Sequence, residues 1–243
     1  MQRLKLTFIH GFMGHPSDWD DVRGSLPQFE TSALEIRPAS GWQSTVGQLA
    51  DQISEPSVVI GYSMGARLAF GIALEQASKC AGLVLVSGNP GLETTEAREQ
   101  RWASDQQIAQ QLQQLDRESV SAFLGQWYKA DVFSSVPAEI RQAEIARKQE
   151  RFSPDWAKVL RACSVARQPD YWPRLQQLSI PTTVVAGDLD EKYHSIAVRV
   201  AAEASSAHVS KTIVPNCGHI VHREQPDVLV RAIQELAVTV AKS

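Results

Sequence analysis

The stretch that most constrains the fold is residues 57–70, which reads SVVIGYSMGARLAF. Residues 58–60 predict a buried β-strand, and the small and apolar residues after Gly65 predict a helix. Gly61 and Gly65 flank Ser63 in a G-x-S-x-G pattern, which permits a sharp strand-to-helix turn and leaves the serine hydroxyl exposed at its apex. The alternative is that Ser63 merely caps the helix. The flanking strand and helix favour the exposed, reactive serine.

Apolar segments alternate with helical patterns on both sides of this turn. The expected strands are residues 4–9, 31–36, 58–60, 81–86, 182–186 and 208–214. The expected helices are residues 17–26, 44–53, the stretch after Ser63, a helix ending near Ala204, and 226–241. This alternation predicts an α/β fold with a mostly parallel central sheet and helices on both faces.

The alternation stops between Leu92 and Leu178. This segment contains no convincing strand and is rich in Gln, Arg, Glu and Ala, so it predicts helices. Prolines divide it into several short ones; they are Pro137, Pro154, Pro169 and Pro173. We therefore expect a helical cap (residues 92–178) inserted between two parts of the sheet domain (residues 1–91 and 179–243).

Polar side chains follow three of the expected strands. They are Ser63, an aspartate within residues 187–190, and His219. The carboxyl ends of parallel strands form one edge of the sheet, where ligands bind in open α/β folds, so these distant loops can converge on one site. A serine hydroxyl needs a neighbouring base, and a histidine base needs a carboxylate to hold its tautomer. The three residues fill these roles.

The chain resembles the α/β-hydrolase superfamily, whose triad follows the same order of Ser, Asp and His. The carboxylate is Asp190 or Asp188, and the family's G-x-x-D pattern favours Asp190. An oxyanion hole in this fold uses the amide after the nucleophile and one from the loop after an earlier strand, which predicts the backbones of Met64 and Phe12. For His10, ordering of that loop is favoured over contact with substrate.

Arg67 lies four residues after Ser63, so both side chains share one face of the expected helix. A buried guanidinium at this point needs an anion, which an anionic substrate can supply. The alternative is a salt bridge on the helix surface.

The composition narrows the classes of partner. Of 243 residues, 43% are hydrophobic, which is ample for a packed core, and the formal net charge is −3. There is no basic excess, so neither a nucleic acid nor a membrane surface is indicated as partner. The three cysteines lie far apart and lack metal-ligand spacing, which favours a reducing cytoplasm over a disulfide framework or a zinc site. No signal peptide and no membrane span is expected.

A closer resemblance is to the 2-succinyl-6-hydroxy-2,4-cyclohexadiene-1-carboxylate synthase family of menaquinone and phylloquinone synthesis. Four passages carry it: residues 9–14 (IHGFMG), 61–67 (GYSMGAR), 89–92 (NPGL) with Arg98, Arg101 and Asp105 following, and 218–226 (GHIVHREQP). The third passage and the segment from Trp127 to Phe133 are the more specific ones. One departure is Asn89, where the family commonly has a histidine.

The resemblance implies a lyase that eliminates pyruvate from a cyclohexene carrying several carboxylates. It implies that the triad serves deprotonation of the substrate, and that no metal, nucleotide or flavin is required. A guanidinium presents a planar, permanently charged fork to a carboxylate. By resemblance, Arg67, Arg101 and Arg147 bind substrate carboxylates, and Tyr62, Trp127 and Phe133 line the pocket.

Two other functions are compatible with the same fold. One is a serine hydrolase of a small ester, thioester or carbon–carbon bond, which shares the triad and differs in the chemistry of the cap. The other is a non-catalytic receptor that uses the pocket for binding, against which the complete triad argues.

Overall fold

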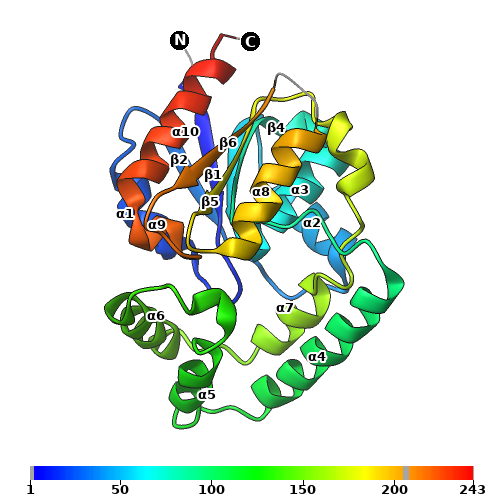
Figure 1. The fold of residues 1–243 in the computed structure, drawn as a ribbon, viewed down its shortest axis with the longest axis vertical. Helices are drawn as coiled ribbons and strands as arrows, with labels where there is room; N and C mark the ends of the chain where they lie inside the picture. The colour runs from blue at the N-terminus through cyan, green and yellow to red at the C-terminus, as the bar shows by residue number, and fades with distance from the viewer. Residues whose placement is uncertain (1–2, 205–207, 243) are drawn as a thin grey trace.

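A central parallel sheet organises the computed structural model, which describes residues 3–204 and 208–242. Its six strands lie in the order β2-β1-β3-β4-β5-β6, and each neighbouring pair is parallel (Figure 1). The strands are β1 (Lys5–Ile9), β2 (Glu30–Leu34), β3 (Ser57–Tyr62), β4 (Cys80–Val86), β5 (Thr182–Gly187) and β6 (Val209–Val214). The expected α/β architecture is therefore confirmed, and the sheet is parallel across all six of these strands.

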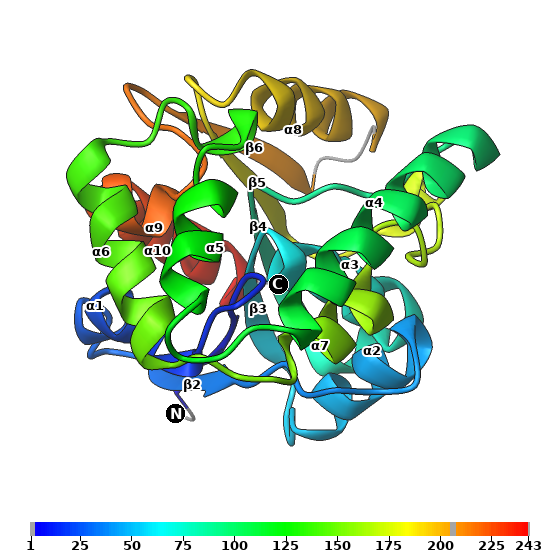
Figure 2. The same ribbon diagram turned by 90° about the horizontal axis from the view of Figure 1, so that it is seen from below.

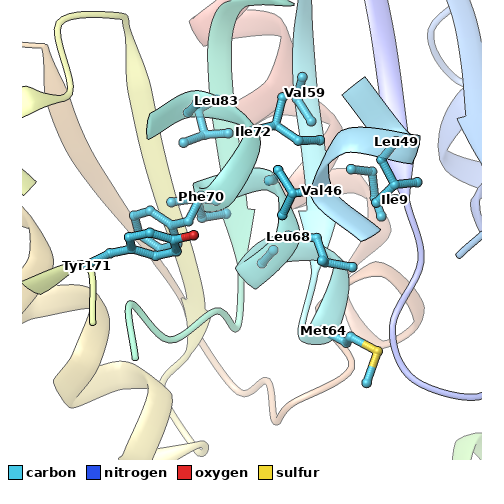
Figure 3. Packing of buried hydrophobic residues seen from close by; sticks show 14 of the residues in the cluster. Ile9, Val46, Leu49, Val59, Met64, Leu68, Phe70, Ile72, Leu83 and Tyr171 are labelled. Atoms are coloured by element: carbon cyan, nitrogen blue, oxygen red, sulfur yellow. The ribbon is translucent and has the colours of Figure 1, made fainter. Parts of the chain in front are cut away.

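Helices cover both faces of the sheet (Figure 1). One face carries α2 (Trp42–Asp51), α3 (Met64–Glu75) and α8 (Glu191–Glu203), whose apolar side chains share one core cluster. The other carries α1 (Asp20–Gly24) and α10 (Pro226–Val240), which share a second cluster. Strand β3 contributes to both because successive side chains point to opposite faces: Val59 belongs to the first cluster, and Val58 and Ile60 to the second. Figure 3 shows Val59 packed among side chains of the first cluster.

The segment predicted as a cap lies beyond the carboxyl ends of the strands (Figure 1). Its helices are α4 (Thr95–Gln113), α5 (Val120–Trp127), α6 (Ala138–Glu150) and α7 (Trp156–Cys163), with 3-10 turns η3 (Asp131–Phe133) and η4 (Trp172–Gln177). Figure 2 shows α5 and α6 on one side and α4 and α7 on the other, and both pairs are in contact. These helices cover the edge of the sheet where the predicted site lies.

The last part of this segment packs into the sheet domain. Tyr171 is fully buried in the first core cluster, where its hydroxyl accepts a hydrogen bond from Trp42 Nε1 at 2.9 Å and donates one to Glu75 at 2.6 Å. Leu175 and Leu178 belong to the same cluster. The cap boundary at residue 178 stays a prediction, because the chain is continuous with the main core from about α7 onward.

Two local details differ from the expected elements. The helix predicted over residues 17–26 begins as a 3-10 turn, η1 (Pro16–Trp19), because the Asp18 carboxylate folds back to accept the His15 amide and tightens this turn. A short helix, α9 (Val221–Glu224), precedes α10 and was not expected. It is kept apart from α10 by Pro226, which begins the longer helix.

A further 3-10 turn, η2 (Ala77–Lys79), connects α3 to β4. No helix within residues 3–204 and 208–242 is both long and apolar enough to cross a membrane.

Candidate active site

Ser63 stands at the sharp turn between β3 and α3, in the strained backbone that the glycine pattern predicts. Its φ of 51° and ψ of −109° lie outside the regions that L-residues ordinarily occupy. The turn requires glycine at position 65, because a Cβ there would collide with the carbonyl oxygens of Ile9 and His10. The Ser63 amide donates to the Val86 carbonyl at 2.8 Å, whereas its hydroxyl makes no capping bond to α3. The geometry therefore contradicts the capping alternative.

The imidazole of His219 lies between Ser63 and Asp190. Its Nδ1 is 2.6 Å from Asp190 Oδ2, and its Nε2 is 3.4 Å from Ser63 Oγ. A carboxylate can only accept, so Nδ1 carries the proton and Nε2 offers its lone pair to the serine. His219 and Asp190 are 3% and 5% exposed, so this pair is shielded from water. The three residues have the arrangement of a nucleophile, a base and an orienting carboxylate.

Asp188 and Asp190 have separate roles in the structure. Asp188 Oδ1 accepts the Cys217 amide at 3.2 Å, which ties the loop after β5 to the loop after β6. Glu224 holds the loop of His219 in a similar way, since its two carboxylate oxygens accept hydrogen bonds from the amides of Gly218 and Ile220 at 2.7 and 2.8 Å. The geometry thus pairs His219 with Asp190 and leaves Asp188 a structural contact.

The two residues predicted to supply the oxyanion amides, Phe12 and Met64, line the same cavity as Ser63. Met64 is the first residue of α3, where amides have no carbonyl one turn earlier and the helix dipole favours negative charge. Phe12 comes from the loop after β1. His10 orders that loop: its Nδ1 donates to the Gly11 carbonyl at 2.7 Å, and its Nε2 accepts the Ile36 amide at 3.1 Å. This supports the loop-ordering role over substrate contact, and burial lowers the pKa of His10 to about 4, which keeps the ring neutral.

A cavity of about 330 Å³ opens in front of Ser63 and His219. Its walls combine the sheet domain with the cap; among its lining residues are Phe12, Met64, Asn89, Trp127 and Phe133. The aromatic rings form a continuous wall, with Trp127 in contact with Phe12 and with Phe133, whose ring meets the edge of His219 at 5.7 Å between centroids. The structure therefore brings Trp127 and Phe133 of the cap to the triad.

Arg67 lines the same cavity and is only 7% exposed. Its guanidinium donates to Gln168 Oε1 at 3.1 Å and to the Cys163 carbonyl at 2.9 Å. Within the described part of the chain it forms no ion pair with a carboxylate, so the surface salt bridge is contradicted. Burial, together with the charge of Arg101, lowers the pKa of Arg67 to about 10, and the side chain remains a cation at neutral pH.

Two further cations line the cavity. Arg101 on α4 is held at 2.8 Å from Asp105, a buried carboxylate that Ser164 also contacts at 2.7 Å. Lys192 on α8 lines the cavity and is exposed to solvent; desolvation by the surrounding cavity wall, and the charge of Arg101, lower its pKa. With Arg67, three cationic side chains line the cavity, against one carboxylate among its described lining residues, that of Asp105.

Two of the predicted binding residues do not line this cavity. Tyr62 lines a smaller cavity of about 50 Å³, together with Lys148 and His222, and Ser63, Trp127 and Phe133 line both cavities. Arg147 lines neither of these cavities; its guanidinium pairs with Glu144 at 2.7 Å and is 38% exposed. The next residue on α6, Lys148, is the one that turns inward. The geometry gives the substrate role predicted for Arg147 no support.

Sequence reasoning also missed two lining residues that follow the triad acid, Lys192 and Tyr193. Their position in the sequence could have indicated this, because the first turn of a helix that begins at the triad carboxylate lies at the same edge of the sheet as the site. No group of three or more His, Cys, Asp or Glu side chains in the described ranges is arranged to hold a metal ion.

Comparison with known proteins places this geometry in a family. Residues 8–232 match the alpha/beta hydrolase family. A 2-succinyl-6-hydroxy-2,4-cyclohexadiene-1-carboxylate synthase from Salmonella arizonae is 33% identical over 246 residues, which span 95% of this chain and 92% of the relative. One from an Enterobacter species is 28% identical over 243 residues, with 95% and 90% covered.

Solved structures show the same fold. MenH from S. aureus superposes with a TM-score of 0.89 at 23% identity, covering 99% of this chain and 96% of that one. An esterase from Thermogutta terrifontis has a TM-score of 0.74 at 20% identity, with 98% and 91% covered. The chain therefore belongs to the alpha/beta hydrolase family and, within it, to the family of the 2-succinyl-6-hydroxy-2,4-cyclohexadiene-1-carboxylate synthases.

Proposed function

We propose that this protein is a lyase that eliminates pyruvate from 2-succinyl-5-enolpyruvyl-6-hydroxy-3-cyclohexene-1-carboxylate, giving 2-succinyl-6-hydroxy-2,4-cyclohexadiene-1-carboxylate. The chain is similar over nearly its whole length to relatives that are named as that synthase. The observation that carries the proposal is the buried guanidinium of Arg67, which lines the same cavity as Ser63 and has no carboxylate partner among the described residues. A buried charge is costly unless it is compensated, and a carboxylate of the substrate compensates it.

The steps of the reaction follow from the chemical structures of the proposed substrate and product. His219 Nε2 takes the proton of the Ser63 hydroxyl, and Ser63 Oγ removes the proton on the ring carbon that carries the succinyl group. That proton is acidic because the succinyl ketone adjoins it. The electron pair forms the first double bond of the diene, the existing double bond shifts, and the bond from the ring to the enolpyruvyl oxygen breaks. The leaving enolate takes a proton and becomes pyruvate.

The proposed roles match the charge that develops. The ketone oxygen becomes an enolate oxygen after deprotonation, and the amides of Phe12 and Met64 would donate hydrogen bonds to it, as in an oxyanion hole. Asp190 stabilises the protonated form of His219. Arg67 and Arg101 bind carboxylates of the ring, the succinyl arm or the enolpyruvyl group. The aromatic wall of Trp127 and Phe133 packs against the ring.

The cysteines support the cytoplasmic location expected from the sequence. Cys80, Cys163 and Cys217 are buried and carry free thiols. A reducing compartment keeps such thiols free, and the small carboxylated substrate proposed here is soluble in it.

One assay separates this lyase from a serine hydrolase. The enolpyruvyl substrate is mixed with the protein, pyruvate is measured by lactate dehydrogenase and NADH, and the diene is followed by its ultraviolet absorbance. We expect both products in equal amounts, and loss of both with Ser63→Ala. Turnover of simple esters without pyruvate release would instead identify a hydrolase. Ligand binding without any chemistry would identify a receptor.

A further inference from the structure

Lys148 connects the cap to the loop that supplies the Phe12 amide. It lies on α6 and is 8% exposed, although lysine is rarely buried without a partner. Its Nζ donates to the Met13 carbonyl at 3.2 Å, across 135 positions of sequence. The same side chain lines the small cavity of about 50 Å³ beside Ser63. The cap therefore contacts the backbone directly after the predicted oxyanion residue.

The loop at Met13 is strained and needs such a contact. Met13 has a φ of 55°, in the left-handed region that favours glycine and costs a methionine about 1–2 kcal/mol. The Gly14 amide donates to the Gly11 carbonyl at 3.1 Å, which closes a tight turn around Phe12 and Met13. The Met13 carbonyl and the Gly14 amide belong to one planar peptide, and the Gly11 carbonyl and the Phe12 amide belong to another. The hydrogen bond from Gly14 to Gly11 therefore couples the direction of the Met13 carbonyl to that of the Phe12 amide.

The Lys148 ammonium is itself held by a network of buried charges. Glu144 Oε2 lies 3.7 Å away, and Glu144 Oε1 is 3.1 Å from Arg223 Nε of α9. Asp18, which follows the same loop, pairs with Arg151 at 3.0 Å and lies 3.7 Å from Arg223. Burial alone would raise the pKa of Asp18, but Lys148 and the His15 amide lower it. These opposite charges fix Lys148 between the oxyanion loop and the helix that follows the catalytic histidine.

We propose that Lys148 is a positioning residue for the oxyanion hole: its hydrogen bond to the Met13 carbonyl aims the Phe12 amide at the oxygen that becomes negative in the reaction. The proposal rests on the proposed function for the identity of that oxygen, since it deepens the role of the same site. Lys148 acts on the reacting atoms through the position of the loop and does not itself contact the substrate.

The test uses a probe that needs the triad and the oxyanion hole but carries no carboxylate. Diethyl p-nitrophenyl phosphate phosphorylates a reactive serine: the bond from Ser63 Oγ to phosphorus forms, the bond from phosphorus to the aryl oxygen breaks, and the serine proton passes to His219. The released p-nitrophenolate gives the rate. Loss of one oxyanion donor costs about 10²–10³ in rate, so a misaimed donor should cost about tenfold. We expect this slowing in Lys148→Met and near-normal labelling in Lys148→Arg.

The matched control is Lys158→Met. Lys158 is a cap lysine on α7 that is 65% exposed and pairs with Asp155 outside the cavity. It should label at the wild-type rate. Thermal unfolding of all variants separates positioning from fold stability, and Lys148→Gln, whose shorter side chain does not reach the Met13 carbonyl, replaces the methionine variant if that one does not fold.

Pyruvate release supplies the second readout. Positioning lowers kcat in Lys148→Met and leaves KM within about twofold, because the interaction strengthens in the transition state. Unchanged labelling would overturn the proposal, and so would a raised KM with normal labelling, which would make Lys148 a substrate ligand. If the wild-type protein released no pyruvate while Lys148→Met still labelled slowly, the proposed function would fall and the positioning role would stand.

Discussion

The charge of Arg67 gives the sharpest test of substrate recognition. In the free protein its guanidinium makes two hydrogen bonds to neutral oxygens and lies 5.6 Å from the centre of the Trp42 ring. None of these groups neutralises it. A substrate carboxylate would add a charge-assisted hydrogen bond, which is worth about 1.5–3 kcal/mol. Since 1.4 kcal/mol is a factor of ten, Arg67→Met should lower kcat/KM by about 10- to 150-fold.

The loss should fall mainly on KM if the carboxylate is bound equally in the ground and transition states. The stability of the fold should change less. Methionine leaves the acceptors of Gln168 and Cys163 without a donor, which costs about 1–3 kcal/mol, but it also removes a desolvated charge, which offsets part of this cost. Phosphorylation of Ser63 by the neutral organophosphate should be unaffected, because that reaction uses no carboxylate site.

Arg98→Met is the matched control for this experiment. Arg98 is also partly buried and donates to two backbone carbonyls, those of Ala166 at 3.3 Å and Gln168 at 2.7 Å, but it does not line the cavity. Its replacement should leave kcat/KM within about twofold. Equal losses in both variants would show that packing of the cap segment, and not carboxylate recognition, explains the effect. An unchanged kcat/KM in Arg67→Met would refute the reasoning outright.

Three further outcomes are expected. Asp190→Asn should lower kcat by about 10⁴-fold because an amide no longer holds the reactive tautomer of the histidine, whereas Asp188→Asn should keep most activity; similar losses in the two, measured by pyruvate release, would contradict the assignment. Lys192→Met should raise KM about two- to fivefold at low salt and less at high salt, since its charge is exposed, while Lys158→Met should show no such salt dependence. Burial, together with the charge of Arg223, lowers the pKa of His222 to about 3, so the unfolded chain takes up its proton first as pH falls below 6.5. The contribution of His222 to the free energy of unfolding is complete above that pH and falls by about 2 kcal/mol between pH 7 and 5. In urea denaturation, His222→Phe should remove this part of the pH dependence of stability.

The centre of the sheet could be predicted from the sequence because β1, β3, β4 and β5 are buried on both faces. Apolar runs such as residues 58–60 and 81–86 mark such strands wherever the helices between them keep their own period. The unexpected details depend on side chains that bond to nearby backbone. Asp18 folds onto the His15 amide and Glu224 onto the Gly218 and Ile220 amides, and a hydrophobic pattern carries no trace of either bond.

The site residues also divide into those that the sequence could predict and those that it could not. Ser63 and His219 could be placed because their loops follow strands whose carboxyl ends must meet. The face that α6 turns inward could not be predicted, since its buried positions are the charged residues Glu144 and Lys148. Helical periodicity finds an inward face by its apolar residues. A helix that buries an ion-pair network gives no such signal, and Arg147 was predicted from the family resemblance alone.

The charged side chains of the two cavities that Ser63 lines differ in their pairing, which gives them different roles. In the small cavity, Glu144 and Lys148 neutralise each other, and Arg223 and Asp18 extend the pairing, so these groups are already satisfied before a ligand arrives. In the large cavity Arg67 has no carboxylate partner in the described chain. Paired charges fix geometry, whereas an unpaired buried cation gains most when an anion binds. Replacing Arg67 should therefore change how tightly a carboxylate substrate binds and spare a neutral probe, and replacing Lys148 should slow the neutral probe as well.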